Sequence, residues 1–274
     1  MKSRGFDGAR SLHREGAPPA ESIQAPLPMS SAGSAAPELR IAGTDRARRC
    51  KEAEVYSKYL PLVGSRVLEL GCGGAEQTVA IAGAAKGVSI TALEVDRIQH
   101  EKNLSKRNLP NVSFKLGGAE AIPEAEESFD IVLMFKSLHH VPVALLEQAL
   151  LEVHRVLRPG GFAYISEPVF AGAFNDIIRL FHDEEAVRRA AFEAVCAAVK
   201  AGLFEVVEEI FFEAPLKFDD FADFEKKIIR ATHNEHRLSA SVHAEVKRRM
   251  EGHATDSGIR FQAPMRVDLL RKPA

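Results

Sequence analysis

The residues best suited to chemistry begin with Glu69, which is followed by a glycine-rich segment, residues 71–75, of sequence Gly-Cys-Gly-Gly-Ala. An apolar run precedes the glycines, and residues 79–83 after them have helical composition. We therefore predict a strand, a tight turn and a helix. Glycine adopts positive φ and lets a ligand approach the backbone, while the free N–H groups at a helix start attract anions. The segment thus predicts a turn that binds a ligand.

A second acid, Glu94, ends the next apolar run, residues 88–94. It follows Gly71 by 23 residues, close to the spacing of roughly 20 at which an acid accepts ribose hydroxyls in nucleotide-binding α/β folds. Asp96 is the rival, because strand alternation places both acids on one face. Because Glu94 lies at the tip of the strand, we expect Glu94 and not Asp96 to accept the ribose hydroxyls. Nicotinamide-dependent dehydrogenases and S-adenosylmethionine-dependent methyltransferases both fit the residues up to this point.

Three later segments separate the two families. They are a strand-like run that leads into Gly-Gly-Ala at residues 117–119, a strand followed by Lys-Ser-Leu-His-His-Val at residues 136–141, and a helix that ends in Leu-Arg-Pro-Gly-Gly at residues 157–161. In this order, over residues 50–170, the series resembles the class I S-adenosylmethionine-dependent methyltransferases, in particular the small-molecule, methyltransferase type 11-like branch. The last two motifs oppose a nicotinamide-dependent dehydrogenase.

The resemblance implies a Rossmann-like, doubly wound α/β fold with a seven-stranded sheet, mostly parallel with an antiparallel last strand. We expect the sixth strand at residues 204–212, the seventh at residues 265–270, and a helical insertion between them. The chain then divides into a disordered leader (residues 1–46, rich in Ala, Gly, Pro and Ser) and a class I methyltransferase domain (residues 47–274). Within that domain, residues 216–264 are expected to form a substrate-cover insertion.

A first helix is expected at residues 45–60, with Thr44 as its N-cap. In the family this helix lies across the mouth of the cofactor site, and a tyrosine on it often contacts cofactor or substrate. Tyr56 or Tyr59 would make that contact here, or the two would simply pack as an aromatic helix face.

S-adenosylmethionine is the cofactor that the resemblance implies. By resemblance, Glu69 orients the ammonium group of its methionine part, and Glu94 accepts its ribose hydroxyls; capping of a helix or turn is the alternative role for Glu69. Ala75 replaces the third glycine of the family pattern, a small change that dinucleotide-binding folds often allow. The expected cofactor-binding residues are Glu69, Gly71, Cys72, Gly73, Glu94, Val95, Gly118, Ala119 and Phe135.

Gly118 departs from the family, in which an aspartate commonly accepts a hydrogen bond from the adenine amino group. Backbone groups of Gly118 and Ala119 can still contact the ring, and Glu120 either replaces the aspartate or is a solvated surface residue. The loss of one such hydrogen bond weakens binding by about 1.5–3 kcal/mol unless water replaces it. The departure therefore affects the expected cofactor affinity more than the fold.

His140 matches a histidine that is frequent in this branch. It is a candidate general base beside the methyl acceptor, because a histidine pKa suits proton transfer at neutral pH; the alternative is that it fixes the loop. The transfer itself is an in-line displacement that depends on alignment more than on acid–base chemistry. Glu167 either lines the substrate cavity or is a solvated strand-end acid. No metal site is expected, because His233 and His236 lack a clear third ligand.

The composition sets the remaining expectations. The formal net charge is −2, so no global field attracts nucleic acid or an anionic membrane. Three cysteines, Cys50, Cys72 and Cys196, lie far apart and are expected to be free thiols of a cytoplasmic protein. Phe135-Lys-Ser-Leu stands where nucleic-acid N-methyltransferases carry an Asn/Asp-Pro-Pro-aromatic block, which counts against a base as acceptor.

The predicted function is methyl transfer to a small-molecule acceptor, with no nucleic-acid or membrane partner. The sequence leaves the acceptor, the atom that is methylated and the oligomeric state open. The alternative is a cofactor-binding protein on the same fold that is non-catalytic or regulatory, because a fold does not dictate an activity.

Overall fold

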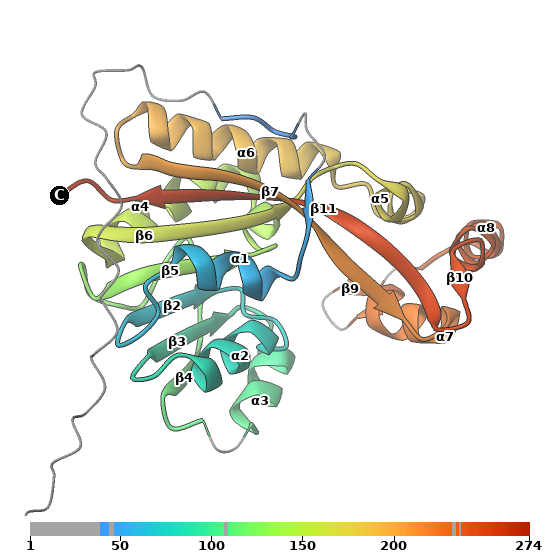
Figure 1. The fold of residues 1–274 in the computed structure, drawn as a ribbon, viewed down its shortest axis with the longest axis horizontal. Coiled ribbons are helices and arrows are strands. Elements are labelled where there is room, and N and C mark those ends of the chain that lie inside the picture. The colour runs from blue at the N-terminus through green and yellow to red at the C-terminus, as the bar shows by residue number, and fades with distance from the viewer. Residues whose placement is uncertain (1–38, 44–46, 107–108, 232–233, 236) are drawn as a thin grey trace, which may run out of the picture. The chain divides into compact units, whose positions relative to one another are not determined.

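A mixed sheet carries the glycine-rich turn at the end of one of its central strands (Figure 1). The computed structural model describes residues 39–274 except 44–46, 107–108, 232–233 and 236. The strand order is β1-β7-β11-β6-β5-β2-β3-β4, with β10 paired to β11. These strands are β1 (Arg48–Arg49), β2 (Arg66–Leu70), β3 (Ser89–Glu94), β4 (Val112–Leu116), β5 (Phe129–Phe135), β6 (Leu157–Pro168), β7 (Glu205–Phe218), β10 (Ala254–Thr255) and β11 (Gly258–Arg271).

Helices connect most of the strands. The α-helices are α1 (Glu52–Tyr59), α2 (Glu76–Ala84), α3 (Arg97–Leu104), α4 (Leu146–Val156), α5 (Ala173–Ile178), α6 (Glu185–Lys200), α7 (Phe221–Phe224) and α8 (Ala240–Glu251). Two 3₁₀ turns, η1 (Leu138–His140) and η2 (Val143–Leu145), follow β5, and a π-helical turn, η3 (Glu225–Ile229), follows α7. A separate two-stranded sheet is formed by β8 (Arg230–Ala231) and β9 (Asn234–Glu235).

The predicted fold class is confirmed. Strands β4, β3, β2, β5 and β6 are parallel to one another, whereas β11 runs antiparallel to both β6 and β7. The two-residue strands β1 and β10 raise the strand count of the sheet from the predicted seven to nine. Parallel strands are covered on both faces, which explains why every residue of β5 is buried.

The two faces of the sheet belong to different core clusters. Leu68 of β2 packs in one cluster with Leu150 of α4. Its neighbour Val67 packs in a second cluster with Tyr56 of α1 and Ile81 of α2. Successive side chains of a strand point to opposite faces, so helices on both faces are needed to bury this apolar strand.

The first helix begins later than predicted. It starts at Glu52 rather than at residue 45, because Arg48 and Arg49 are extended and pair in parallel with β7. The prediction of a helix start at residue 45 is therefore wrong, and the proposed cap, Thr44, lies outside the described residues.

Most of the predicted leader, residues 1–38 and 44–46, lies outside the described residues. The described residues 39–43 differ from the expectation of disorder, because they contact the sheet. The Nε of Arg40 donates to Glu209 at 2.8 Å, and Leu39 packs against the cluster that contains α4.

The last two long strands extend further than predicted. Strands β7 and β11 remain paired out to Phe218 and Ile259, so the segment between them is residues 219–257 rather than 216–264. Pairing between two strands that lie far apart in sequence gives no local signal of where it ends. The periodicity of either strand alone therefore underestimates its length.

A distal lobe lies at the far end of this β7–β11 ribbon and includes α5, α7 and α8 (Figure 1). Its core cluster consists of Ile177, Ile178, Phe218, Phe221, Phe224, Ile229, Val246, Met250, Ile259 and Phe261. The rings of Phe218 and Phe224 lie edge to face, with 5.4 Å between centroids. The three phenylalanines at 218, 221 and 224 thus pack against one another here.

Two further observations complete the fold. All three cysteines are free, as predicted. Within the described part of the chain, no helix combines the length and the apolar character that crossing a membrane requires.

Candidate functional site

The glycine-rich segment, residues 71–75, forms a motif turn between β2 and α2. Gly71 and Gly73 have φ angles of 68° and 52°. A Cβ on Gly71 would lie 2.7 Å from the Cβ of Ser137, so no side chain fits there. Ala75 is buried with a φ of 60°, which places alanine in the left-handed conformation that glycine adopts at lower cost.

The carboxylate of Glu94, at the end of β3, faces the motif turn. Its Oε2 accepts the N–H of Gly73 at 2.7 Å, and its Oε1 accepts the N–H groups of Val95 and Asp96 at 2.8 and 2.9 Å. A carboxylate offers about four acceptor positions, so Oε2 retains room for one more donor. The side chain of Asp96 instead caps α3 by accepting the N–H of Ile98 at 2.9 Å. Glu94 therefore faces the motif turn, whereas Asp96 caps α3 and its second oxygen, Oδ2, is buried without a hydrogen-bond partner among the described residues.

Asn103 of α3 holds the motif turn from the other side. Its Nδ2 donates to the carbonyl oxygen of Gly73 at 2.7 Å and contacts the sulfur of Cys72 at 3.5 Å. Burial, with the nearby charges of Glu69 and Glu94, raises the pKa of the Cys72 thiol, so the thiol stays protonated. Cys72 is thus no nucleophile, and its backbone holds the turn, since its N–H donates to the carbonyl of Leu93 at 2.9 Å and its carbonyl accepts the N–H of Ala75 at 2.8 Å.

Glu69 is buried at the β2 end of the turn, where its Oε2 accepts the hydroxyl of Thr78 at 2.6 Å. Burial raises the pKa of this carboxyl to about 7, although the hydrogen bond from Thr78 acts in the opposite direction. A cation placed beside the carboxyl would favour its ionised form. The environment of Glu69 therefore suits a positively charged ligand group such as an ammonium.

At the end of β4, the absent side chain of Gly118 is replaced in space by that of Glu120. Both carboxylate oxygens of Glu120 lie in the volume that a Cβ on Gly118 would enter. Glu120 is half-buried and Ala119 is buried. The preceding residue, Gly117, donates its N–H to the carbonyl of Glu94 at 3.1 Å. A carboxylate thus lies close to the position where the sequence lacks an aspartate.

Phe135, the last residue of β5, is part of a row of aromatic rings. Its ring centroid lies 5.8 Å from that of Tyr56 and 5.6 Å from that of Tyr164. The hydroxyl of Tyr164 donates to Glu52 of α1 at 2.6 Å. Tyr59 lies apart from this row and hydrogen-bonds with its neighbour Lys58. Of the two tyrosines considered on the first helix, Tyr56 is therefore the one next to Phe135.

The loop after β5 contains the two adjacent histidines. Ser137 donates from its Oγ to the carbonyl of Leu70 at 2.7 Å, which ties this loop to the end of β2. His139 is buried, and its Nδ1 pairs with the carboxylate of Glu167 at the end of β6. The candidate base, His140, is exposed.

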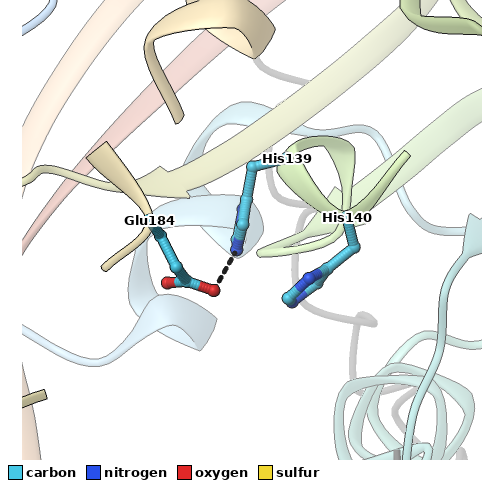
Figure 2. Close-up of side chains that lie close together, drawn as sticks. All are labelled: His139, His140 and Glu184. Atoms are coloured by element: carbon cyan, nitrogen blue, oxygen red, sulfur yellow. Dashed lines mark ion pairs between the residues drawn. The ribbon is translucent and has the colours of Figure 1, made fainter. Parts of the chain in front are cut away.

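Figure 2 shows that His139, His140 and Glu184 converge. The Nε2 of His139 lies 3.7 Å from Oε1 of Glu184, and the two histidine rings are 4.1 Å apart between centroids. Burial lowers the pKa of His139, but the carboxylates of Glu167 and Glu184 outweigh that effect and raise it to about 9. We call His139, His140 and Glu184 the histidine–glutamate cluster.

A cavity of about 130 Å³ lies beside this cluster. Its wall includes Glu167, Phe170, Arg188 and Arg266. Arg188 also donates to the Oε2 of Glu184 at 2.5 Å. Glu167 and Arg188 therefore line the cavity and also contact His139 and Glu184 of the cluster. That Glu167 lines a cavity for the substrate stays a prediction.

Three residues of the site were missed by sequence reasoning. Asn103, Glu184 and Arg188 belong to no recognisable motif. Asn103 and Glu184 act through contacts with residues that are distant in the chain, and Arg188 acts through Glu184, four residues before it. The one available signal was the acidic run before α6, which favoured a helix start. That run indicated where Glu184 lies in the secondary structure but not that it approaches His139.

Comparisons with known proteins agree with the fold. Residues 67–161 match a family model described as a methyltransferase domain. A probable phthiotriol/phenolphthiotriol dimycocerosates methyltransferase from Mycobacterium ulcerans is 37% identical over 134 residues, which cover 46% of this chain and 50% of that protein. The chain spans about half the length, or less, of the curated relatives it matches.

Solved structures share the fold. A putative methyltransferase from Bacillus halodurans superposes with a TM-score of 0.56 at 18% identity, over 81% of this chain and 99% of that chain. The cyclase SpnF superposes with a TM-score of 0.54 at 18% identity, over 85% and 88% of the two chains. Residues 67–161 thus match a methyltransferase domain, and the strand order agrees with the fold of the solved methyltransferase structure.

Proposed function

We propose that the protein transfers a methyl group from S-adenosylmethionine to a small-molecule acceptor. The observation that carries the proposal is the Glu94 carboxylate, which faces the motif turn with Oε2 open to one more donor. Bound S-adenosylmethionine supplies an electrophilic methyl group on a sulfonium sulfur. The chain's own task is to bind this group, align the acceptor and exclude water.

The described residues fit this cofactor. Glu94 would accept the ribose hydroxyls, and the buried Glu69 would hold the ammonium group. Glu120 would accept from the adenine amino group, because its carboxylate takes the place of the absent side chain at 118. The backbone and side chains that would complete the site are Gly71, Cys72, Gly73, Val95, Gly118, Ala119 and Phe135.

The acceptor side of the site would lie at the loop after β5. Phe135 and Tyr56 form an aromatic wall there, which is suited to excluding water and to contact with a cationic sulfonium. His140 is exposed on this loop, so we propose that it contacts the acceptor and takes its proton when the acceptor is a hydroxyl. One relative is named as a methyltransferase of phthiotriol derivatives, and the word phthiotriol denotes a triol. This name supports a hydroxyl group as the acceptor.

Thermal melting with ligands tests the cofactor. S-adenosylmethionine or S-adenosylhomocysteine at about 100 times its dissociation constant adds about 2.7 kcal/mol to the free energy of unfolding. That corresponds to a rise of roughly 5–10 °C in melting temperature for a domain of this size. NAD should leave the melting temperature unchanged, and a rise with NAD alone would contradict the proposal.

A pair of variants sharpens this test. Glu94→Gln removes the charge from the acceptor of the ribose hydroxyls and should weaken cofactor binding about 10–100-fold, as expected for a charge-assisted hydrogen bond of 1.5–3 kcal/mol. Glu101→Gln, on the exposed face of α3, is the matched control and should bind as the wild type does. Equal affinity of both variants would remove Glu94 from the site.

A cofactor-binding protein without methyl transfer is the second candidate. It is favoured by Gly118, which lacks the carboxylate that the family commonly has, and by the fold shared with a cyclase. Transfer of isotope-labelled methyl from S-adenosylmethionine to a panel of hydroxylated small molecules separates the two. Cofactor binding without labelled product across the panel would favour the non-catalytic role.

A further inference from the structure

The histidine–glutamate cluster has the composition of a metal site. Its three potential ligand atoms, one from each of His139, His140 and Glu184, all lie within 4.8 Å of one another. We propose that these three side chains bind one divalent transition-metal ion, with Zn²⁺ as the representative ion. The sequence did not predict this site, because Glu184 is 44 residues from His140 and follows no motif.

The spacing of His139 and Glu184 supports an ion between them. Their facing atoms, Nε2 and Oε1, are 3.7 Å apart, which is too long for a hydrogen bond. Two ligands that bind a tetrahedral Zn²⁺ at bond lengths of about 2.0–2.2 Å lie about 3.4 Å from one another. The observed distance is therefore closer to that of two ligands of a common ion than to that of a direct hydrogen bond.

The second nitrogen of His139 is already held in the way that metal-binding histidines require. Its Nδ1 pairs with the carboxylate of Glu167, whose other oxygen accepts the N–H of Leu138 at 2.9 Å. Histidine ligands commonly donate their remaining N–H to a carboxylate, which fixes the tautomer and the ring orientation. Glu167 thus directs Nε2 of His139 toward Glu184 and the proposed ion.

Glu184 is oriented as firmly as His139. Its Oε2 accepts from Arg188 at 2.5 Å, and its Oε1 lies 2.8 Å from Nε2 of His182. The carboxylates of Glu167 and Glu184 together carry more negative charge than Arg188 neutralises. A protonated His139 balances the second carboxylate when no ion is bound, and a divalent cation would take the place of that proton.

The ligand types select the class of ion. Two imidazoles and one carboxylate suit Zn²⁺ and its first-row neighbours, whereas Mg²⁺ and Ca²⁺ prefer sites made of oxygen atoms. His140 is exposed whereas His139 and Glu184 are buried, so the solvent side of the ion would retain an open position. If the proposed methyl transfer is correct, an acceptor hydroxyl would occupy that position and the ion would lower its pKa, and His140 would then serve as a ligand and not as the base proposed above.

Metal binding by the complete, untagged chain tests the site without requiring methyl transfer. Metal-free protein would be titrated with Zn²⁺ by calorimetry and with Co²⁺ by visible absorption. The expected result is one ion per chain and the absorption pattern of tetrahedral Co²⁺. Failure of this test would leave cofactor binding, which is measured separately by melting, unaffected.

Variants assign the binding to the cluster. His140→Ala removes an exposed ligand, so it should fold normally and weaken Zn²⁺ binding at least 10-fold. Glu167→Gln should weaken it by about 10–100-fold through the orientation of His139. The matched control is His243→Ala, because His243 also pairs with a glutamate, Glu225 at 2.7 Å, but lies outside the cluster.

Each outcome decides the proposal. Loss of Zn²⁺ affinity in His140→Ala with retention in His243→Ala supports the site, provided that both variants have wild-type circular dichroism. Equal affinity of His140→Ala and the wild type would overturn it, and His139 would then be a protonated bridge between two glutamates. Binding that is lost in His243→Ala instead would place the ion elsewhere and would equally overturn it.

Discussion

The parallel half of the sheet and the distal lobe are built on different kinds of contact. In the parallel half, β2 to β5, the groups that could bind a cofactor are backbone N–H groups and carboxylates at adjacent strand ends, such as Gly73 and Glu94 at 2.7 Å. In the distal lobe, the contacts are between apolar side chains from segments far apart in the chain, such as Phe174 and Phe261 with 5.3 Å between centroids.

The two regions therefore differ in what a substitution would change, which is ligand binding in the parallel half and packing in the distal lobe. The motif turn tolerates few substitutions because its backbone conformation and close approaches are specific, whereas an apolar cluster mainly requires volume. We therefore expect the parallel half to lose ligand binding through small changes, and the distal lobe to lose stability without loss of cofactor binding.

The largest expected effect on stability comes from a substitution in the core of the distal lobe. Phe224→Ala removes a fully buried ring that packs against Phe218 and Phe221. The expected cost is about 3–5 kcal/mol of lobe stability, measured as faster amide exchange in α7 and α8. Amides of β2 and β5 in the same sample are the control, and S-adenosylmethionine affinity should change less than twofold. If cofactor binding were lost while the amides of β2 stayed protected from exchange, the two regions would not be separable.

A smaller effect on stability is expected from a substitution in the motif turn, but this substitution should abolish cofactor binding. Gly71→Ala meets both a positive φ and the side chain of Ser137, at an expected cost of about 2–4 kcal/mol from backbone strain and overpacking. Gly160→Ala is the matched control, because Gly160 has a φ of 76° with no atom near its Cβ position. It should cost only about 1–2 kcal/mol and leave cofactor affinity unchanged. Equal losses of stability and of cofactor affinity in the two variants would contradict the role of the close approach between residue 71 and Ser137.

The smallest expected effect is a pH dependence of the free energy of unfolding that arises from Glu69 in the parallel half. The pKa of Glu69 is raised by burial from 4.5 to about 7 in the folded protein, so the folded state binds more protons than the unfolded state between these values. The free energy of unfolding therefore falls as pH rises through this window, by about 2–3 kcal/mol from this group. Glu69→Gln should flatten the decline in a denaturation series from pH 4.5 to 7.5. The same slope in the variant and the wild type would show that other groups cause it.

The sequence predicted the parallel half well, because its signals are local. The strand before Gly71, the acid at the tip of β3 and the turn after α4 each lie within a few residues of the feature that they specify. Distant contacts carried no such signal. The start of α1 was predicted too early because Arg48 pairs with Phe212, and β7 and β11 were predicted too short because only their mutual pairing extends them.

The site shows the same division. The acids at 69 and 94 could be found from spacing and resemblance, and both lie near the ends of their strands beside the motif turn. Glu120 could be named only as one of two possibilities, since its position depends on how the chain turns after β4. The approach of Glu184 to His139 could not be predicted, because an ion pair between a loop and a helix start forty-five residues later depends on the packing of α6 on the sheet.

The paired end of the β7–β11 ribbon has a consequence for how such proteins can be re-engineered. Phe218 faces Ile259 across the ribbon, so the ends of the intervening segment are held at the spacing of neighbouring strands, about 4.8 Å. Residues 219–257 of the distal lobe are therefore attached between two adjacent anchor points, whereas α5 enters the lobe from the chain after β6. A foreign segment with similarly close ends could be grafted in place of residues 219–257 if it also covers the apolar side chains of α5. A library of such chimeras would vary the lobe while the strands of the sheet keep their register.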